Sequence, residues 1–306
     1  MELQGLRITT AHWDNDRALL SDIRRKVFIE EQNVDERLEW DGADAAATHF
    51  LAYSGNSAIG CARLIGNKIG RMAVLNAFRS LGVGAALLDH IKRHAHNQRI
   101  TRLELSAQCH AYQFYRRAGF CAEGRPYADA GIPHVDMVYR VFAHEQEKSL
   151  YDINSDDQLH HAGGLLELNG MFDMLLSQCR QNLTISMHDP EHPLWRRELL
   201  LSRIKQLARD NRRFEVQILL DSEHVLINEH PLVQLQQRIS SKIQLRITRE
   251  TLSNLIVADS SAWLDFEQQE GRSCYADRSR TRQLQERFRT CWEKAALPQE
   301  ARRLHL

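Results

Sequence analysis

Residues 77–93 read AFRSLGVGAALLDHIKR, and this stretch decides how the first half of the chain is expected to fold. Gly82 and Gly84 stand where an apolar helical pattern begins, although glycine inside a helix is less favourable than alanine by about 1 kcal/mol. A helix N-terminus presents unpaired backbone N–H groups and the positive end of the helix dipole, and glycine lets an anion approach closely. The stretch therefore predicts an anion-binding loop, with Arg79 adding a charge, or a tight strand-to-helix turn without a ligand.

Two common phosphate-binding motifs do not fit this stretch. The Gly-Lys-Ser/Thr of a Walker A loop is missing. A dinucleotide fingerprint would have its third glycine where this chain has Leu87. The loop by itself therefore identifies no particular nucleotide.

The segments around the loop predict a mixed α/β sheet. Two runs, HFLAYS (49–54) and AIGCARLI (58–65), flank Gly55-Asn56-Ser57 and predict a β-hairpin. Apolar residues at helical spacing predict helices on both sides of this hairpin. The further predicted elements are strands at 68–74, 102–108 and 134–141, and helices after Asp16, after Gly84 and through Phe114 and Tyr115 to Gly119.

Six motifs lie within or around this part of the chain: VFIEEQNV (27–34), EWDGAD (39–44), AIGCARL (58–64), IGRMAVLNAFRSLGVGAALL (69–88), AQCHAYQFYRRAGF (107–120) and DAGIPHVDM (129–137). They resemble the GCN5-related N-acetyltransferases (GNAT), in particular the ElaA/YjcF-like branch. The resemblance covers essentially residues 6–140. It implies the GNAT fold, a mixed and mostly antiparallel sheet flanked by helices, over residues 1–143. It also implies acetyl-CoA as co-substrate and an amine that attacks the thioester directly.

The resemblance implies where the cofactor would bind. The strand before the loop would hold the pantetheine and the thioester through its backbone at Met72, Ala73 and Val74. Gln108 stands where relatives often carry Asn and would contact the cofactor arm, with Phe114 nearby. The loop residues implied to hold the pyrophosphate are Arg79, Ser80, Leu81, Gly82, Val83, Gly84 and Ala85.

Acetyl transfer needs a neutral amine, a polarised carbonyl and a proton for the leaving thiolate. A backbone N–H within residues 72–74 is expected to stabilise the oxyanion. Tyr115 is the expected acid, by resemblance and because a phenol has an O–H to donate. The alternative is that Tyr115 is a core aromatic residue at the end of a short helix.

The sequence does not identify the general base. Many relatives carry Glu on the strand that corresponds to residues 69–74, but this chain has no carboxylate there. His134 is favoured because Gly131-Ile132-Pro133 fixes its position before a strand. The candidates for the base or the acceptor side are Glu30, Glu31, His49, Asp129 and His134, or a chain of water molecules. The missing carboxylate keeps a second function open, an acyl-CoA-binding sensor or scaffold with a weak or inactive transferase site.

The second half of the chain has a different pattern. Its polar start, with Asn154-Ser155-Asp156-Asp157, predicts a linker over residues 144–160. Repeated helix–strand alternation over residues 161–306 predicts a second α/β layered domain. An arginine-rich final helix is expected to be a solvated face.

The run SNLIVADSSAWL (253–264) resembles part of a phospholipase D-like half-domain. Active members carry His-x-Lys followed by four residues and Asp. These positions fall on Leu252, Asn254 and Asp259, so the nucleophile and the phosphate-binding cation are missing. This domain is therefore expected to be degenerate and non-catalytic, and to bind a phosphate-rich ligand, a partner protein or a second copy of the chain as a homodimer.

The composition of the whole chain sets further limits. Its 306 residues hold 40 Lys+Arg and 40 Asp+Glu, so a zero net charge makes nucleic acid an unlikely partner. The six cysteines are scattered without a CxxC pair, which predicts neither a disulfide framework nor a metal cluster. Neither a signal peptide nor a run of about 20 apolar residues is visible. The sequence predicts a two-domain, cytoplasmic enzyme that acts on a small-molecule or protein amine and does not bind a membrane.

Overall fold

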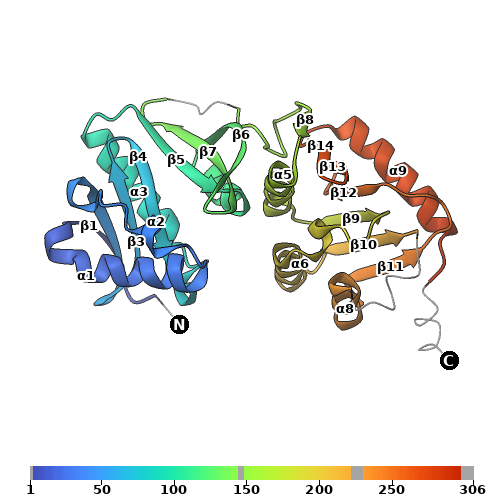
Figure 1. Cartoon of the computed structure of the whole chain (residues 1–306), viewed down its shortest axis with the longest axis horizontal. Coiled ribbons are helices and arrows are strands. Elements are labelled where there is room, and N and C mark those ends of the chain that lie inside the picture. Colours follow the sequence, from blue (N-terminus) through green and yellow to red (C-terminus); the bar gives the residue numbers. More distant parts are fainter. Residues whose placement is uncertain (1–2, 144–147, 222–229, 298–306) are drawn as a thin grey trace. The chain divides into compact units, whose positions relative to one another are not determined.

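The computed structural model describes residues 3–143, 148–221 and 230–297 (Figure 1). The chain divides into two compact units. The first consists of Met1–Ala107, Phe114–Gly124 and Ala128–Glu147, and the second of Gln108–Gln113, Arg125–Tyr127 and Lys148–Leu306. Two short pieces of the predicted acetyltransferase domain therefore belong to the second unit.

The first unit is built on a seven-stranded sheet with the order β1-β2-β3-β4-β5-β7-β6. Consecutive strands from β1 to β4 are antiparallel, whereas β4 runs parallel to β5. The hairpin predicted around Gly55-Asn56-Ser57 is confirmed by β2 and β3. The sequence patterns do not predict β1 and β6. The strands are β1 (Leu6–Ala11), β2 (Thr48–Ser54), β3 (Ser57–Ile65), β4 (Lys68–Val74), β5 (Arg102–Gln108), β6 (Cys121–Asp129) and β7 (Ile132–Arg140).

Helices cover both faces of this sheet (Figure 1). On one face, α1 (Trp13–Arg24) buries Leu20 and Ile23 in a cluster with Leu51. Phe50 points to the other face because side chains alternate along a strand, and its ring meets His90 and His94 of α3. The helices are α1, the π-helix η1 (Arg25–Glu31), α2 (Glu36–Glu39), α3 (Val83–Asn97) and α4 (Tyr112–Arg117), with short 3₁₀ turns η2 (Asp44–Ala46), η3 (Asn76–Phe78) and η4 (Cys109–Ala111).

The second unit contains a seven-stranded sheet with the order β11-β10-β9-β12-β13-β14-β8. β9, β10 and β11 are parallel, and the remaining strands pair antiparallel. The predicted second α/β domain is therefore present, with an antiparallel half that the helix–strand alternation does not predict. The strands are β8 (His160–Ala162), β9 (Asn182–Met187), β10 (Glu215–Leu220), β11 (Ile243–Ile247), β12 (Asn254–Ala258), β13 (Ala262–Glu267) and β14 (Glu270–Cys274).

Helices also cover this second sheet (Figure 1). The final helix α9 packs Leu284 in a cluster with Val257 and Trp263. α5 faces β14, and the Tyr275 hydroxyl just after that strand donates to the Met171 carbonyl at 2.8 Å. The helices are α5 (Leu165–Gln178), the 3₁₀ turn η5 (Pro193–Arg196), α6 (Glu198–Asp210), α8 (Pro231–Arg238) and α9 (Arg278–Lys294).

The predicted linker is largely packed within the second unit. Ser149, Tyr151, Asp152 and Asp156 are each at most 4% exposed. The Asp156 carboxylate accepts from the Tyr151 N–H and lies 2.7 Å from Nε2 of His160. Buried hydrogen bonds therefore hold a segment whose composition predicts a surface connection. The first four residues of that predicted linker, 144–147, lie outside the described residues.

Two copies of the tripeptide His-Pro-Leu open helices of the second unit, at residues 192–194 and 230–232. In each copy Nδ1 of the histidine accepts from the leucine N–H, at 3.3 Å for Leu194 and 3.2 Å for Leu232. Nε2 meets a carbonyl in both, that of Gln268 at 2.5 Å and that of Pro190 at 3.1 Å. Because Nδ1 accepts and Nε2 donates, both imidazoles are neutral helix caps.

Candidate functional site

The first feature of the site is a gap between β4 and β5. These strands pair at Lys68↔Glu104 and Ile69↔Leu105, and the ladder between them ends at the second pair. Just beyond, the register of β3 against β4 shifts between Cys61 and Arg63, and Arg71 adopts a left-handed backbone with φ of 50°. A bulge of this kind bends a strand, so β4 turns away from β5 after Ile69.

The bend leaves backbone groups of β4 pointing into the gap. Leu75 N–H donates to the Ile59 carbonyl at 2.9 Å, and Ala73 pairs with Cys61, so both residues direct their polar groups toward β3. Because this direction alternates along a strand, Val74 directs its N–H and C=O toward the gap. Nε of Arg79 donates to the Val74 carbonyl at 2.9 Å. The Val74 N–H therefore faces the gap between the two strands.

The predicted phosphate loop lies at the end of β4 and leads into α3. Ala86 N–H donates to the Gly82 carbonyl at 3.0 Å, so Gly82 is the residue at which the helix begins. The N–H groups of the first turn, at Val83, Gly84 and Ala85, therefore point out of the helix end. The structure brings the loop residues together with Met72, Ala73 and Val74 on consecutive parts of one strand–loop–helix unit.

The two glycines serve different purposes. Gly82 has φ of +85°, a left-handed conformation that favours glycine. A Cβ there would meet no atom within 4 Å, so the backbone conformation and not a lack of space is the reason for glycine. A Cβ on Gly84 would lie 3.0 Å from Cζ of Phe114 and 3.5 Å from Cε of Met72. Gly84 thus lets the Phe114 ring and Met72 approach the start of α3. Ser80 also has a positive φ, 62°, and Leu81 is 40% exposed, which together make this a tight, exposed turn.

Arg79 has partners within the protein. Its Nη1 and Nη2 donate to Oε1 and Oε2 of Glu31 at 2.5 and 2.7 Å, in addition to the bond from Nε to Val74. The guanidinium hydrogen bond lowers the pKa of Glu31. Arg79 therefore links β4, the loop and the end of η1, and the structure shows this linking contact rather than a free cation.

Tyr115 lies against β4. Its hydroxyl is 3.8 Å from Sδ of Met72, and its ring meets Phe114 at 4.9 Å between centroids. Burial raises the pKa of Tyr115 to about 12, so the phenol keeps its proton at neutral pH. The side chain is nevertheless only half-buried. Tyr115 is thus a protonated hydroxyl beside the strand expected to hold the thioester. Gln108, at the end of β5, belongs to the second unit.

The candidates for the general base are dispersed. Glu30 and Asp129 are exposed, on η1 and at the end of β6. His49 is 1% exposed, and its Nε2 lies 2.8 Å from the Asp44 carbonyl; burial lowers its pKa. His134 is 8% exposed, with Nδ1 2.8 Å from the Ile132 carbonyl. Both histidines are enclosed, so an amine in solution reaches the two carboxylates more easily.

The structure contains a closed ring of charged side chains next to β4, which the sequence analysis does not predict. Arginines and carboxylates alternate around it, and each neighbouring pair is an ion pair. Two of its carboxylates belong to the ends of the EWDGAD motif, and Arg71 lies on β4 at the bulge. The pairs are Arg24–Glu39 (2.5 Å), Glu39–Arg71 (2.9 Å), Arg71–Asp41 (3.1 Å), Asp41–Arg63 (2.5 Å), Arg63–Asp44 (2.9 Å) and Asp44–Arg24 (2.7 Å).

Similarity to known proteins identifies the first half of the chain. A family profile described as "Acetyltransferase (GNAT) domain" matches residues 16–141. The Bacillus subtilis (strain 168) protein named "Uncharacterized N-acetyltransferase YjcF" is 31% identical over 121 residues, which span 38% of this chain and 86% of that protein. The chain belongs to the GNAT acetyltransferase family. The GNAT fold and the N-acetyltransferase class predicted from the sequence are confirmed.

Other relatives in the GNAT family cover the same region. Protein ElaA of Escherichia coli (strain K12) is 28% identical over 131 residues, 40% of this chain and 86% of ElaA. The crystal structure of Escherichia coli ElaA aligns at 25% identity and a TM-score of 0.41, covering 44% of this chain and all of that one. The ElaA/YjcF-like relationship predicted for this GNAT domain therefore holds at the level of sequence.

Residues 167–304 match a domain of unknown function, DUF7931. The phospholipase D-like resemblance stays a prediction, and the structure shows what its three positions do. The Asp259 carboxylate accepts from the backbone N–H groups of Gln181 and Asn182, at 2.8 and 3.1 Å. Asn254 is 4% exposed and accepts from the N–H of His188 and Asp189. Both side chains hold backbone in place, while Leu252 supplies an N–H to Asp221.

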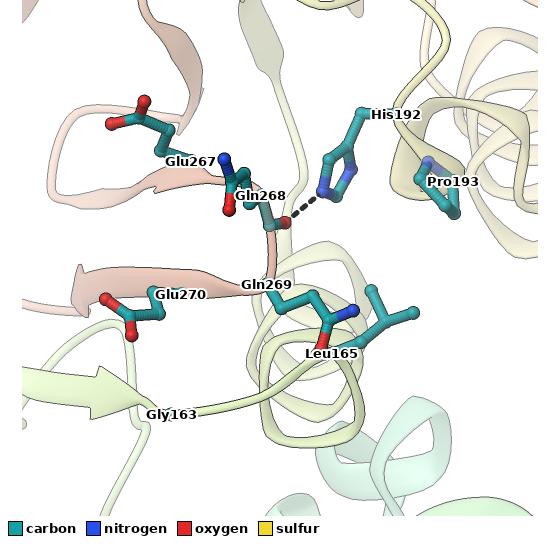
Figure 2. Close-up of a pocket in the computed structure, with 8 residues that line it drawn as sticks. All are labelled: Gly163, Leu165, His192, Pro193, Glu267, Gln268, Gln269 and Glu270. Carbon is teal, nitrogen blue, oxygen red and sulfur yellow. Dashed lines mark hydrogen bonds between the residues drawn. The ribbon is translucent and has the colours of Figure 1, made fainter.

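A cavity of about 770 Å³ lies in the second unit of this GNAT protein (Figure 2). Its ionisable lining groups are His192, Glu267 and Glu270. Figure 2 shows the His192 imidazole directed at the Gln268 carbonyl, and its other nitrogen caps η5. Since both nitrogens of His192 are occupied, the cavity has no free imidazole to act as a base. The remaining lining residues are Gly163, Leu165, Pro193, Gln268 and Gln269.

Two negative findings concern metal ions and membranes. Within 3–143, 148–221 and 230–297, no group of three or more His, Cys, Asp or Glu side chains is arranged to hold a metal ion. In the same ranges, no helix has the length and apolar character needed to cross a membrane.

Proposed function

We propose that this N-acetyltransferase binds acetyl-CoA where β4 and β5 diverge and transfers the acetyl group to an amine that attacks the thioester directly. The observation that carries the proposal is the pairing of two backbone features at the end of β4. By strand alternation the Val74 N–H faces the gap between the strands, and the loop after it ends in a left-handed Gly82 at the start of α3. The first feature suits a thioester carbonyl and the second suits a pyrophosphate.

The proposed roles follow from these positions. Met72, Ala73 and Val74 would line the pantetheine arm with Phe114, and the Val74 N–H would donate to the developing oxyanion. The loop from Arg79 to Ala85 would bind the pyrophosphate through its N–H groups. Tyr115 would donate a hydrogen bond, and then a proton, to the departing CoA thiolate, because its phenol stays protonated.

The proton of the amine needs a separate acceptor. We infer that exposed Glu30 or Asp129, acting directly or through water, is better placed for this than buried His49 or His134. The argument is accessibility, since a general base must come within hydrogen-bond reach of the substrate proton.

Calorimetry and thiol release test the proposed function together. The full chain should bind acetyl-CoA and CoA, and should release free CoA thiol when supplied with one member of an amine panel. The panel would contain a polyamine, free amino acids, an aminoglycoside and a lysine peptide. Absence of acetyl-CoA binding would overturn the proposal.

One observation favours an alternative, an acyl-CoA-binding sensor or scaffold with weak turnover. Residues 69–74 of β4 carry no carboxylate, and both candidate histidines are enclosed. Tight binding of acetyl-CoA with no thiol release across the panel would favour this alternative. Thiol release that depends on one amine would exclude it.

For the domain organisation, we propose a GNAT domain over residues 1–143, a connecting segment over residues 144–160 and a non-catalytic domain over residues 161–306. The bonding of Asn254 and Asp259 to backbone supports the absence of phospholipase D-like catalysis. Incubation of the full chain with a chromogenic phosphodiester tests this. Hydrolysis of the phosphodiester would overturn the non-catalytic assignment and leave the proposal for the transferase site unchanged.

A further inference from the structure

We propose that Arg71 is a positioning residue of the transferase, and that the ring of ion pairs built on the EWDGAD motif holds β4 in the bent form that places the Val74 N–H. This inference rests on the proposed function, because it concerns the same thioester site. Three observations support it: the backbone conformation of Arg71, the contacts of its guanidinium and the closure of the ring of ion pairs.

The backbone of Arg71 is in a conformation that its side chain must help to hold. A non-glycine residue with φ of 50° inside a strand is strained and persists only where its surroundings fix it. The guanidinium makes these contacts with the 38–41 segment: Nη2 donates to the Leu38 carbonyl at 2.9 Å and to the Glu39 carbonyl at 3.0 Å. The ion pairs to the carboxylates of Glu39 and Asp41 add to these. Arg71 is therefore fixed at both its backbone and its side chain.

The bulge at Arg71 has a matching contact on β3. The Arg71 carbonyl accepts from the Cys61 thiol at 3.6 Å. Cys61 is 1% exposed, and burial raises its pKa to about 12, so the thiol keeps the hydrogen that it donates. Ala73 pairs with Cys61 directly afterwards. The bulge therefore ends at Ala73, and the next residue, Val74, is the one whose N–H faces the gap.

The closed ring joins three other segments of chain to β4. Arg24 comes from α1, Arg63 from β3, and the carboxylates from residues 39–44. Most of these side chains are at most 7% exposed, and only Asp41 and Arg71, at 35% and 23%, reach solvent. Removing one buried partner leaves its neighbours with an unbalanced charge, so the members act as one unit. Arg71 is the member through which the ring acts on the strand of the site.

A labelled cofactor tests this without knowledge of the acceptor amine. The full chain would be mixed with acetyl-CoA carrying ¹³C at the thioester carbonyl, and the carbonyl resonance would be compared between free and bound cofactor. A hydrogen bond from the Val74 N–H shifts this resonance in the wild type. Arg71→Gly suits the left-handed backbone but removes the guanidinium, and we expect it to lose more than half of that shift. Its acetyl-CoA Kd should change by less than about threefold, because the loop binds independently of the carbonyl.

A matched control is available at Arg99, an exposed arginine that also has a left-handed backbone, with φ of 57°. Arg99→Gly should keep the wild-type shift and Kd. A wild-type carbonyl shift in Arg71→Gly would overturn the role of Arg71 and leave the proposed function intact. Absence of acetyl-CoA binding by the wild type would instead overturn the proposed function. If Arg71→Gly does not fold, the near-isosteric Asp41→Asn decides the question: a reduced shift with retained binding supports the proposal, and a wild-type shift overturns it.

Discussion

Glu31 and Arg79 face each other in a two-pronged ion pair, with Oε1 2.5 Å from Nη1 and Oε2 2.7 Å from Nη2. Arg79 also donates from Nε to the Val74 carbonyl. The last residue of η1, the end of β4 and the loop before α3 are thus joined through one guanidinium. Glu31 is the final Glu of the VFIEE sequence, so this link gives that motif a structural role.

Substitutions at this pair should weaken acetyl-CoA binding to different degrees. Glu31→Gln keeps the bond between Arg79 and Val74 and removes only a partly exposed ion pair, whose contribution is typically below about 1 kcal/mol. We expect its Kd for acetyl-CoA to rise by about threefold. Arg79→Gln loses both links and should raise the Kd by about tenfold. Calorimetry checks both; tighter binding by Glu31→Gln would show instead that Glu31 competes with the phosphates for Arg79.

Alanine at the two glycines of the loop should separate conformation from close approach. Gly82→Ala places a Cβ on a left-handed backbone, which costs about 1–2 kcal/mol, and should both destabilise the fold and weaken acetyl-CoA binding. Gly84→Ala should displace Phe114, because the new Cβ would lie 3.0 Å from Cζ of that ring. Gly66→Ala is the control, since Gly66 has φ of +58°, open space and a place in the β3–β4 turn. Denaturation and calorimetry should show a loss of stability alone for Gly66→Ala.

Tyr115→Phe should lower turnover without affecting cofactor binding. Loss of one acid–base group typically costs a factor of about 10²–10⁴, and the retained ring should keep the acetyl-CoA Kd within about twofold. Because the pKa of Tyr115 is raised to about 12, its ionisation should produce no falling limb in kcat below about pH 11. Thiol release with the amine that the panel identifies measures both effects. Tyr53→Phe, on β2, is the control, and wild-type turnover in Tyr115→Phe would exclude Tyr115 as the acid.

Local pattern predicts much of the fold of the first half. β4 and β5 begin and end at the predicted residues. In β5 buried residues alternate strictly with less buried ones, which is the pattern of a half-buried strand. β6 is missed because Gly124 and Pro126 interrupt its pattern. In the second half, β13 and β14 form a tight hairpin that the helix–strand alternation does not signal. Its strands bury residues on both faces, so their sequence lacks the regular alternation of a half-exposed strand.

The candidate site likewise has a part that local sequence predicts and a part that it does not. The loop before α3 is contiguous in sequence, so its glycines and its motif predict it directly. The ring of ion pairs is not contiguous: Arg24 and Arg71 are brought to the same carboxylate, Glu39, only by the packing of α1 against the sheet. Spacing in the sequence carries no information about that contact. The acidic EWDGAD motif opposite two strand arginines is the signal that could have indicated it, since charged residues in strands are seldom buried unless paired.

Stability should fall between about pH 7 and pH 5, in part because of the His230 cap. Burial is the main cause that lowers the pKa of His230 below its ordinary 6.5. Below about pH 6.5 the unfolded chain therefore takes up a proton that the folded chain does not, so acid favours unfolding. This group adds at most about 1.4 kcal/mol per pH unit to that loss, and the loss continues until the folded-state pKa is reached.

The matched variant is His230→Asn, because asparagine is a good helix N-cap and does not titrate. Its stability at pH 7 should stay close to that of the wild type, and its loss of stability between pH 7 and pH 5 should be smaller. Urea denaturation at a series of pH values measures both. An unchanged pH dependence in His230→Asn would show that His230 is protonated to the same extent in the folded and unfolded states, contrary to its role as a neutral cap that accepts from Leu232.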